Sequence, residues 1–172
     1  PTHRVVANLG NYDGRIFREQ LAGSFVIEPH PSLAGLLTAM KANSHFIGMS
    51  DGKDFVLLRP KNLEMLRPLF ANKPPLWHTL SVAILHVAIL EALLGIDETR
   101  LREESNVTYW REPEQALDQL RHGAQLVFFL NPTQVTDVQA VADARSRMPQ
   151  KSTDFYPKLL SGLVFHSLVS DR

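Results

Sequence analysis

The sequence predicts an α/β (α+β) fold, a mixed β-sheet with helices packed against it. Segments with strand-like and helix-like patterns alternate along the chain, as is typical of a sheet layered with helices. Residues 126–130 form a continuous apolar run of strand length, which favours a central strand covered on both faces. Two short apolar runs, 45–49 and 55–58, flank Asp51-Gly52, a strong short-range signal of a β-hairpin. The predicted fold class rests on these three observations.

In the first part of the chain, strands are predicted at residues 2–8 and 24–28, and a helix follows each of them. Asp13 is suited to cap the first helix, whose apolar spacing stops at Gly23. Ser32 is suited to cap the second helix, which carries its leucines on one face.

The middle of the chain contains a boundary and the longest predicted helix. Pro74-Pro75 would divide the chain into two small lobes, residues 1–73 and 76–172. Residues 79–94 predict a helix that is apolar on nearly all sides, with Gly95 as its C-terminal stop. Because it lacks a polar face, we expect this helix to be buried.

The last part of the chain continues the alternation. Strands are predicted at residues 107–110 and 163–168 in addition to the central run. Glu112-Pro113-Glu114 predicts a helix start, with proline in the first turn and acidic residues near the positive end of the helix dipole. A further helix is predicted over 134–144, followed by a loop over 148–158.

Composition excludes several classes of function. The 18 Lys and Arg residues balance the 18 Asp and Glu residues, so the chain has no global field to hold a polyanion, and we do not expect a nucleic-acid partner. The chain has no cysteine, which removes disulfides, thiolate metal sites and cysteine nucleophiles and fits a reducing, cytoplasmic compartment. No run of about 18 uninterrupted apolar residues predicts a membrane span.

The loop over residues 148–158 is the main candidate for a ligand site. Ammonium groups and hydroxyl donors suit a phosphate or carboxylate ligand, and prolines pre-organise the loop. The alternative is a surface connector with solvated charges. The glycines of a P-loop are absent. The candidate residues of this loop are Lys151, Ser152, Thr153, Tyr156 and Lys158.

Two other pairs of residues are candidates for binding an anion. Asn131 and Thr133 lie between a buried strand and a helix, where ligands bind in open α/β sheets. Simple helix capping by either residue is the alternative and is favoured. His3 and Arg4 could bind an anion or transfer a proton, or be ordinary strand residues. The histidines follow no metal-binding pattern, so no metal site is predicted.

His86 lies inside the long predicted helix. A lone histidine there is more often a hydrogen-bonded core residue than a catalyst, and we take His86 as a core candidate. Glu91 follows five positions later, so an α-helix would not place it on the same face as His86.

Several short motifs follow one another along the chain: Phe128-Phe129-Leu130-Asn131-Pro132-Thr133, Met148-Pro149-Gln150-Lys151-Ser152-Thr153 and Phe155-Tyr156-Pro157-Lys158. In this order they resemble the C-terminal signature of a bacterial family, the domain-of-unknown-function family numbered 1015, some members of which are labelled SpoOJ/ParB-like. Pro1-Thr2-His3-Arg4 is similar to a mid-chain segment of that family, and Leu85-His86 is similar to part of its buried helix. Asp154 departs from the pattern, since the family usually has an aromatic residue there.

The resemblance implies that the chain is the C-terminal portion of a longer bacterial protein, whose N-terminal half would be a partner. It also implies an ATP-dependent phosphotransferase acting on a small hydroxyl substrate such as free serine, with ATP and Mg²⁺ as cofactors. The substrate hydroxyl would then be the nucleophile. The residues that would hold phosphate are His3, Arg4, Lys151, Ser152, Thr153 and Lys158.

Two alternatives to an enzyme stay open. The first is a non-enzymatic ParB-like binding module, which the family label suggests and the zero net charge disfavours. The second is a structural domain whose loop docks the N-terminal half, with Lys151 and Lys158 paired with carboxylates across an internal interface. The residues alone leave open whether the chain is an enzyme.

Overall fold

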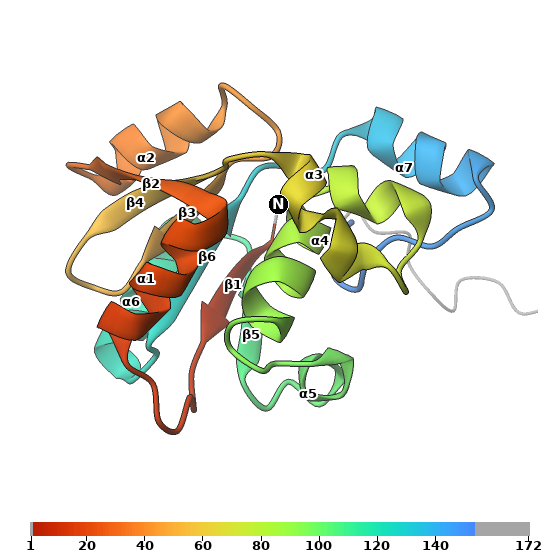
Figure 1. Ribbon diagram of the computed structural model, residues 1–172. Helices are drawn as coiled ribbons and strands as arrows, with labels where there is room; N and C mark the ends of the chain where they lie inside the picture. The colour runs from red at the N-terminus through yellow and green to blue at the C-terminus, as the bar shows by residue number, and fades with distance from the viewer. Residues whose placement is uncertain (1, 154–172) are drawn as a thin grey trace, which may run out of the picture.

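The computed structural model describes residues 2–153 of the chain, and within them six strands form one sheet in the order β2-β4-β3-β6-β1-β5 (Figure 1). Every described pairing is antiparallel. Helices pack against this sheet, which confirms the predicted α/β class. The predicted strand at 163–168 lies outside the described residues. The strands are β1 (His3–Val6), β2 (Phe25–His30), β3 (Ile47–Ser50), β4 (Phe55–Pro60), β5 (Val107–Trp110) and β6 (Leu126–Leu130).

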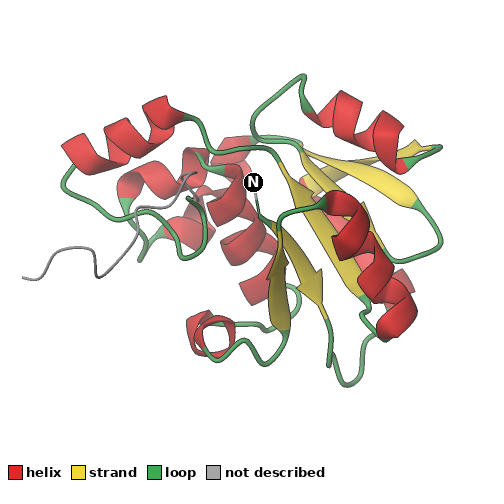
Figure 2. Ribbon diagram, turned by 180° about the vertical axis from the view of Figure 1, so that it is seen from behind, coloured by secondary structure: helices red, strands yellow, loops and turns green. Residues whose placement is uncertain are grey.

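The helices are short, and several of them pack against the sheet (Figure 2). The α-helices are α1 (Gly14–Ser24), α2 (Leu33–Met40), α3 (Leu63–Leu66), α4 (Ser81–Ile84), α5 (Glu98–Arg102), α6 (Pro113–Asp118) and α7 (Val135–Asp143). Three 3₁₀-helices, η1 (Arg67–Phe70), η2 (Pro75–Thr79) and η4 (Gln119–His122), and one π-helix, η3 (Leu85–Glu91), are interspersed with them. None of the helices within residues 2–153 combines the length and the apolar character that a membrane crossing requires.

The sheet separates two apolar cores. Successive residues of a strand point to opposite faces. Val6 and Phe128 accordingly belong to the larger core, with residues of α1, α4 and η3, whereas Val5 and Phe129 belong to the smaller core, with residues of α2 and α6. All five residues of β6 are buried, as expected for a central strand covered on both faces. The larger core includes residues from both sides of the Pro74-Pro75 boundary.

The predicted helix caps of the first part of the chain are confirmed. Asp13 Oδ1 accepts hydrogen bonds from the backbone N–H groups of Arg15 and Ile16, at 2.8 and 3.2 Å. Ser32 Oγ accepts one from the N–H of Gly35 at 3.1 Å. These bonds satisfy backbone donors that the first turn of a helix leaves without partners.

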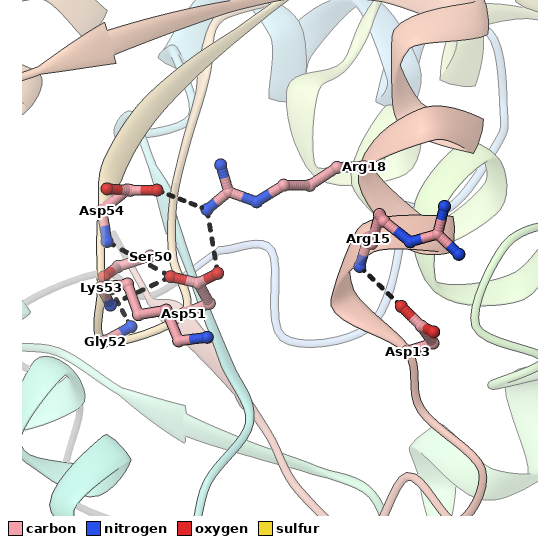
Figure 3. A network of polar contacts seen from close by, with 8 residues as sticks. All are labelled: Asp13, Arg15, Arg18, Ser50, Asp51, Gly52, Lys53 and Asp54. Carbon is pink, nitrogen blue, oxygen red and sulfur yellow. Dashed lines mark hydrogen bonds and ion pairs between the residues drawn. The ribbon is translucent and has the colours of Figure 1, made fainter.

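The hairpin predicted at Asp51-Gly52 joins β3 and β4, and an arginine ties it to α1. Gly52 adopts a left-handed φ of 87°, which glycine tolerates. Arg18 Nη2 donates to Asp51 Oδ2 at 2.9 Å and to Asp54 Oδ2 at 3.0 Å (Figure 3). Burial opposes ionisation of Asp51, but Arg18 and the backbone N–H groups of the turn outweigh it, and the pKa of Asp51 is lowered.

The long helix predicted over residues 79–94 forms over residues 81–91 and is largely buried, but its winding changes along its length. The short α4 passes directly into the π-helix η3. Here the N–H of Ala92 donates to the carbonyl of Val87 at 3.2 Å, a span of five residues in place of four. Gly95, with φ 67°, follows as the predicted stop.

Gly48 of β3 leaves no room for a side chain, and adding a methyl group there should destabilise the protein. A Cβ at this position would lie 2.8 Å from Met40 Sδ, 2.9 Å from Leu36 Cδ2 and 3.1 Å from Phe129 Cβ. We expect Gly48→Ala to lower the free energy of unfolding by about 1–3 kcal/mol through overpacking. Urea denaturation followed by circular dichroism measures this change.

Gly23 in α1 provides the matched control, since a Cβ there meets no described atom within 4 Å. Gly23→Ala should leave stability unchanged or raise it, because alanine favours a helix over glycine by about 1 kcal/mol. Equal effects of the two substitutions would contradict the packing at Gly48.

Candidate anion-binding site

Arg4 of β1 is a buried charge at the centre of the candidate site, with only 1% of its surface exposed. Its Nε donates to Nε2 of His86 at 3.3 Å, and its Nη2 donates to the carbonyl of Lys151 at 3.0 Å. Its Nη1 donates to the hydroxyl and the carbonyl of Thr2. Burial lowers the pKa of Arg4 to about 10, so the guanidinium is still charged at neutral pH. Within residues 2–153, no carboxylate forms an ion pair with it.

Tyr109 of β5 lies opposite Arg4 in the sheet register. Its ring centre is 5.2 Å from Cζ of Arg4 and 5.5 Å from Nζ of Lys151, within the range of cation–π attraction. The Tyr109 hydroxyl is buried and has no hydrogen-bond partner among the described residues. Burial raises the pKa of Tyr109, although the nearby Arg4 opposes the shift.

A pocket of about 310 Å³ opens beside His86. Residues of the larger core and of the loop after α7 form its wall, and its charged residues include three cations and two carboxylates. Lys73 Nζ is paired with Glu98 at 2.7 Å and with Glu91 at 3.4 Å. The guanidinium groups of the other two cations form no ion pair within residues 2–153. The lining side chains include Lys73, Trp77, His86, Glu91, Arg102 and Arg147.

The π-helix places His86 and Glu91 on the same pocket, which corrects the prediction that they would lie on different faces. That prediction assumed α-helical winding, in which residues three and four apart are neighbours. In a π-helix the backbone hydrogen bond spans five residues, so residues 86 and 91 lie one turn apart. Both side chains line the pocket beside Arg4.

His86 is both a hydrogen-bonded core residue, as predicted, and part of the pocket wall. Because its Nε2 accepts a hydrogen bond from Arg4, the proton of the neutral ring lies on Nδ1. Burial, followed by the charges of Arg4 and Lys73, lowers the pKa of His86 well below its usual value. The ring is therefore neutral at physiological pH.

His3 does not join Arg4 in one site, contrary to the expectation that both would hold the same anion. Adjacent residues of β1 point to opposite faces of the sheet. His3 lies on the face of the smaller core, where its ring packs edge-on against Phe129 with the ring centres 5.4 Å apart. Its Nδ1 accepts a hydrogen bond from the backbone N–H of Leu130 at 3.3 Å. Burial is the main cause that lowers the pKa of His3 to about 4.

Asn131 and Thr133 diverge, and neither caps α7. The N-cap of that helix is Gln134, whose side chain makes no capping bond. Nδ2 of Asn131 donates to the carbonyl of Met40 at 2.8 Å and so ties β6 to the end of α2. The hydroxyl of Thr133 donates instead to the carbonyl of Ser152 at 2.8 Å. The favoured capping alternative is therefore wrong for both residues.

The described part of the loop of residues 148–158, the signature loop, is held by hydrogen bonds and an ion pair. Ser152 Oγ donates to the carbonyl of Pro149 at 2.6 Å, and the hydroxyl of Thr2 donates to the carbonyl of Lys151 at 2.8 Å. The ammonium group of Lys151 lies 3.4 Å from Glu104. Thr153 is exposed, and Tyr156 and Lys158 lie outside the described residues. Arg4, Thr133, Lys151 and Ser152 are thus brought together.

Comparison of the chain with protein-family models, curated proteins and solved structures finds no match. Within residues 2–153, no group of three or more His, Cys, Asp or Glu side chains could hold a metal ion.

The sequence pattern did not point to several residues of this site. Lys73, Trp77, Arg102 and Arg147 come from segments far apart in the chain, and nothing in their local spacing indicates a shared pocket. Tyr109 was expected only as a strand residue. Its alignment with Arg4 depends on the pairing of β1 with β5, a contact between residues over 100 positions apart.

Removal of the His86 acceptor should destabilise the protein, because Arg4 Nε would lose its hydrogen-bond partner in the core. We expect His86→Leu to lower the free energy of unfolding by about 1–3 kcal/mol. His86→Gln, which keeps an acceptor oxygen, should cost less. Chemical denaturation measures both values, and a leucine variant as stable as the glutamine variant would show that the bond contributes nothing.

The buried, neutral His3 should make stability depend on pH. Its pKa is about 4 in the folded protein and about 6.5 when unfolded, so the unfolded chain binds more protons between these values. The contribution of His3 to the free energy of unfolding is fully present above about pH 6.5 and falls as the pH drops towards 4. His3→Asn, which keeps an acceptor, should flatten this slope in thermal melts recorded from pH 7 to 4. An unchanged slope would contradict the depressed pKa.

Proposed function

We propose that this domain binds a small molecule carrying a phosphate or carboxylate group in the pocket beside His86. The observation that carries the proposal is the buried guanidinium of Arg4, which has no carboxylate counterion within residues 2–153 and contacts a histidine of the pocket wall. Burying a charge without a counterion is costly, and an anion in the pocket would offset that cost.

The lining of the pocket supports an anionic ligand. Lys73 balances only part of the charge of Glu91 and Glu98, while Arg102 and Arg147 form no ion pair among the described residues. A guanidinium presents paired N–H donors that match a phosphate or a carboxylate. The neutral His86 adds no charge of its own and acts as a positioning residue, since its Nε2 is occupied by Arg4.

We further propose that the protein is an ATP-dependent phosphotransferase acting on a small hydroxyl substrate such as free serine. It is supported by the resemblance in the motifs of residues 128–133 and 148–158. Phosphoryl transfer depends mainly on positioning and on stabilising the charge of the transferred group. Arg102 and Arg147 would hold phosphate oxygens, and Arg4 would add positive potential behind His86.

The described residues do not fit the Mg²⁺ ion that such a reaction employs. Mg²⁺ takes carboxylate oxygens together with phosphate oxygens and water. The two carboxylates of the pocket, Glu91 and Glu98, are engaged by Lys73, and residues 2–153 contain no cluster of metal ligands. No step through a metal ion is therefore assigned to them.

One observation favours a second candidate function, a structural domain that holds no ligand at the signature loop. Lys151 is paired with Glu104 and lies over Tyr109, so its ammonium group already has carboxylate and aromatic partners. In this alternative the signature loop is a structural element and its lysine does not touch a ligand.

Anion binding can be tested through the fluorescence of Trp77, which lines the pocket. The chain has two tryptophans, so Trp110→Phe leaves Trp77 as the sole reporter. Inorganic phosphate, pyrophosphate, ATP and succinate are titrated separately. We expect a saturable change with at least one of them, and a rise in Kd of about tenfold or more in Arg102→Gln and Arg147→Gln, since a hydrogen bond to a charged group contributes about 1.5–3 kcal/mol.

Arg121→Gln is the control, because Arg121 is exposed and pairs with Asp118 away from the pocket. The proposal would be overturned if no anion changed the fluorescence, or if Arg102→Gln, Arg147→Gln and Arg121→Gln lost affinity equally. Saturable ATP binding followed by transfer of phosphate to serine would support the enzyme, whereas binding without transfer would leave a binding module.

Lys151→Ala should keep the Kd unchanged if the loop is structural, with a loss of stability below about 1 kcal/mol for its exposed ion pair.

A further inference from the structure

A second pocket lies at the other end of β1. It shares no lining residue with the pocket beside His86, the anion pocket. It has a volume of about 230 Å³ and opens between the loop of residues 8–13 and the turn that follows η3. Its apolar wall includes Phe17, Leu93 and Leu94. Its polar wall includes the amides Asn11 and Gln20, the carboxylate Asp13 and the guanidinium of Arg100.

The loop that forms this pocket is held rigidly by side-chain amides. Gln125 Oε1 accepts from the N–H of Leu9 at 2.7 Å, and its Nε2 donates to the Leu9 carbonyl at 2.9 Å. Nδ2 of Asn106 donates to the carbonyls of Ala7 and Asn8. These bonds hold Asn8 in a left-handed conformation, with φ 58°. The pocket is therefore pre-organised, which lowers the entropic cost of binding a ligand.

The two charged side chains of the pocket are available to a ligand. The guanidinium of Arg100 forms no hydrogen bond or ion pair within residues 2–153. Asp13 uses Oδ1 to cap α1, as the bond to the N–H of Arg15 shows (Figure 3). The cap bonds lower the pKa of Asp13, so its carboxylate is ionised at neutral pH. Its Oδ2 accepts no hydrogen bond from the described residues.

We propose that this pocket binds a free amino acid with an apolar side chain. One cation and one anion in the lining match a zwitterion, with the ligand's carboxylate at Arg100 and its ammonium group at Asp13 and the amide oxygens. The apolar wall formed by Leu93 and Leu94 receives the side chain. The volume is below the roughly 300–1,000 Å³ of pockets for drug-sized ligands, which suits a molecule of this size.

Isothermal titration calorimetry with leucine, valine and phenylalanine tests the proposal. We expect saturable binding of at least one of them. Three compounds, each lacking one group of leucine, test the three proposed contacts separately. Leucinamide lacks the carboxylate, 4-methylpentanoate lacks the ammonium group, and serine lacks the apolar side chain. Each should bind at least about tenfold more weakly, the loss that corresponds to 1.4 kcal/mol.

Two neighbouring arginines of α5 provide a matched pair of variants. Arg100→Gln should weaken amino-acid binding about tenfold or more, whereas Arg102→Gln, whose side chain lines the anion pocket, should leave it unchanged. Asp13→Asn should also weaken it while α1 stays capped, because asparagine caps helices as well as aspartate does. Thermal melts without ligand confirm that the variants fold.

Three outcomes would overturn the proposal: no heat with any of the three amino acids, full affinity in Arg100→Gln, or an equal loss in Arg102→Gln. The last would assign the amino acid to the anion pocket. The binding proposals for the two pockets are tested with separate titrations and with Arg100→Gln in one pocket and Arg102→Gln in the other. One proposal can therefore be overturned while the other is supported.

Discussion

The buried guanidinium of Arg4 is the interaction on which the candidate site depends. Its donors connect three segments far apart in the sequence, namely the start of β1, the π-helix η3 and the loop that contains Lys151. Each connection gives one of the donors of the buried guanidinium an acceptor. Because desolvating such a charge is expensive, the surrounding backbone carbonyls and His86 must stay in place for the fold to tolerate it.

The alternation of side chains along β1 explains why one strand takes part in both cores. Arg4 faces the larger core and the anion pocket, while its neighbour His3 packs against Phe129 in the smaller core. The same strand then leads into the loop of residues 8–13, which forms the second pocket. A four-residue strand, buried at every position, thus links the two proposed ligand sites.

Local patterns predicted the elements well, and tertiary contacts decided the rest. The Asp51-Gly52 hairpin, the caps at Asp13 and Ser32, and the buried central strand β6 each follow from residues near one another in the chain. The π-winding of η3 does not, since its apolar residues also suit an α-helix. The partners of Thr133 and Lys151 and the grouping of Arg102 with Arg147 depend on how distant segments pack, which periodicity does not encode.

The sheet order has a consequence for the sequence of events during synthesis. Strands β2, β3 and β4 all lie between Phe25 and Pro60, so this antiparallel unit can pair as soon as that stretch has left the ribosome. Strand β1 precedes the other described strands in the chain, yet its partners β5 and β6 begin only at Val107 and Leu126. Contacts of such long sequence separation form late. The strand carrying Arg4 therefore waits for these partners until residues 107–130 have been translated.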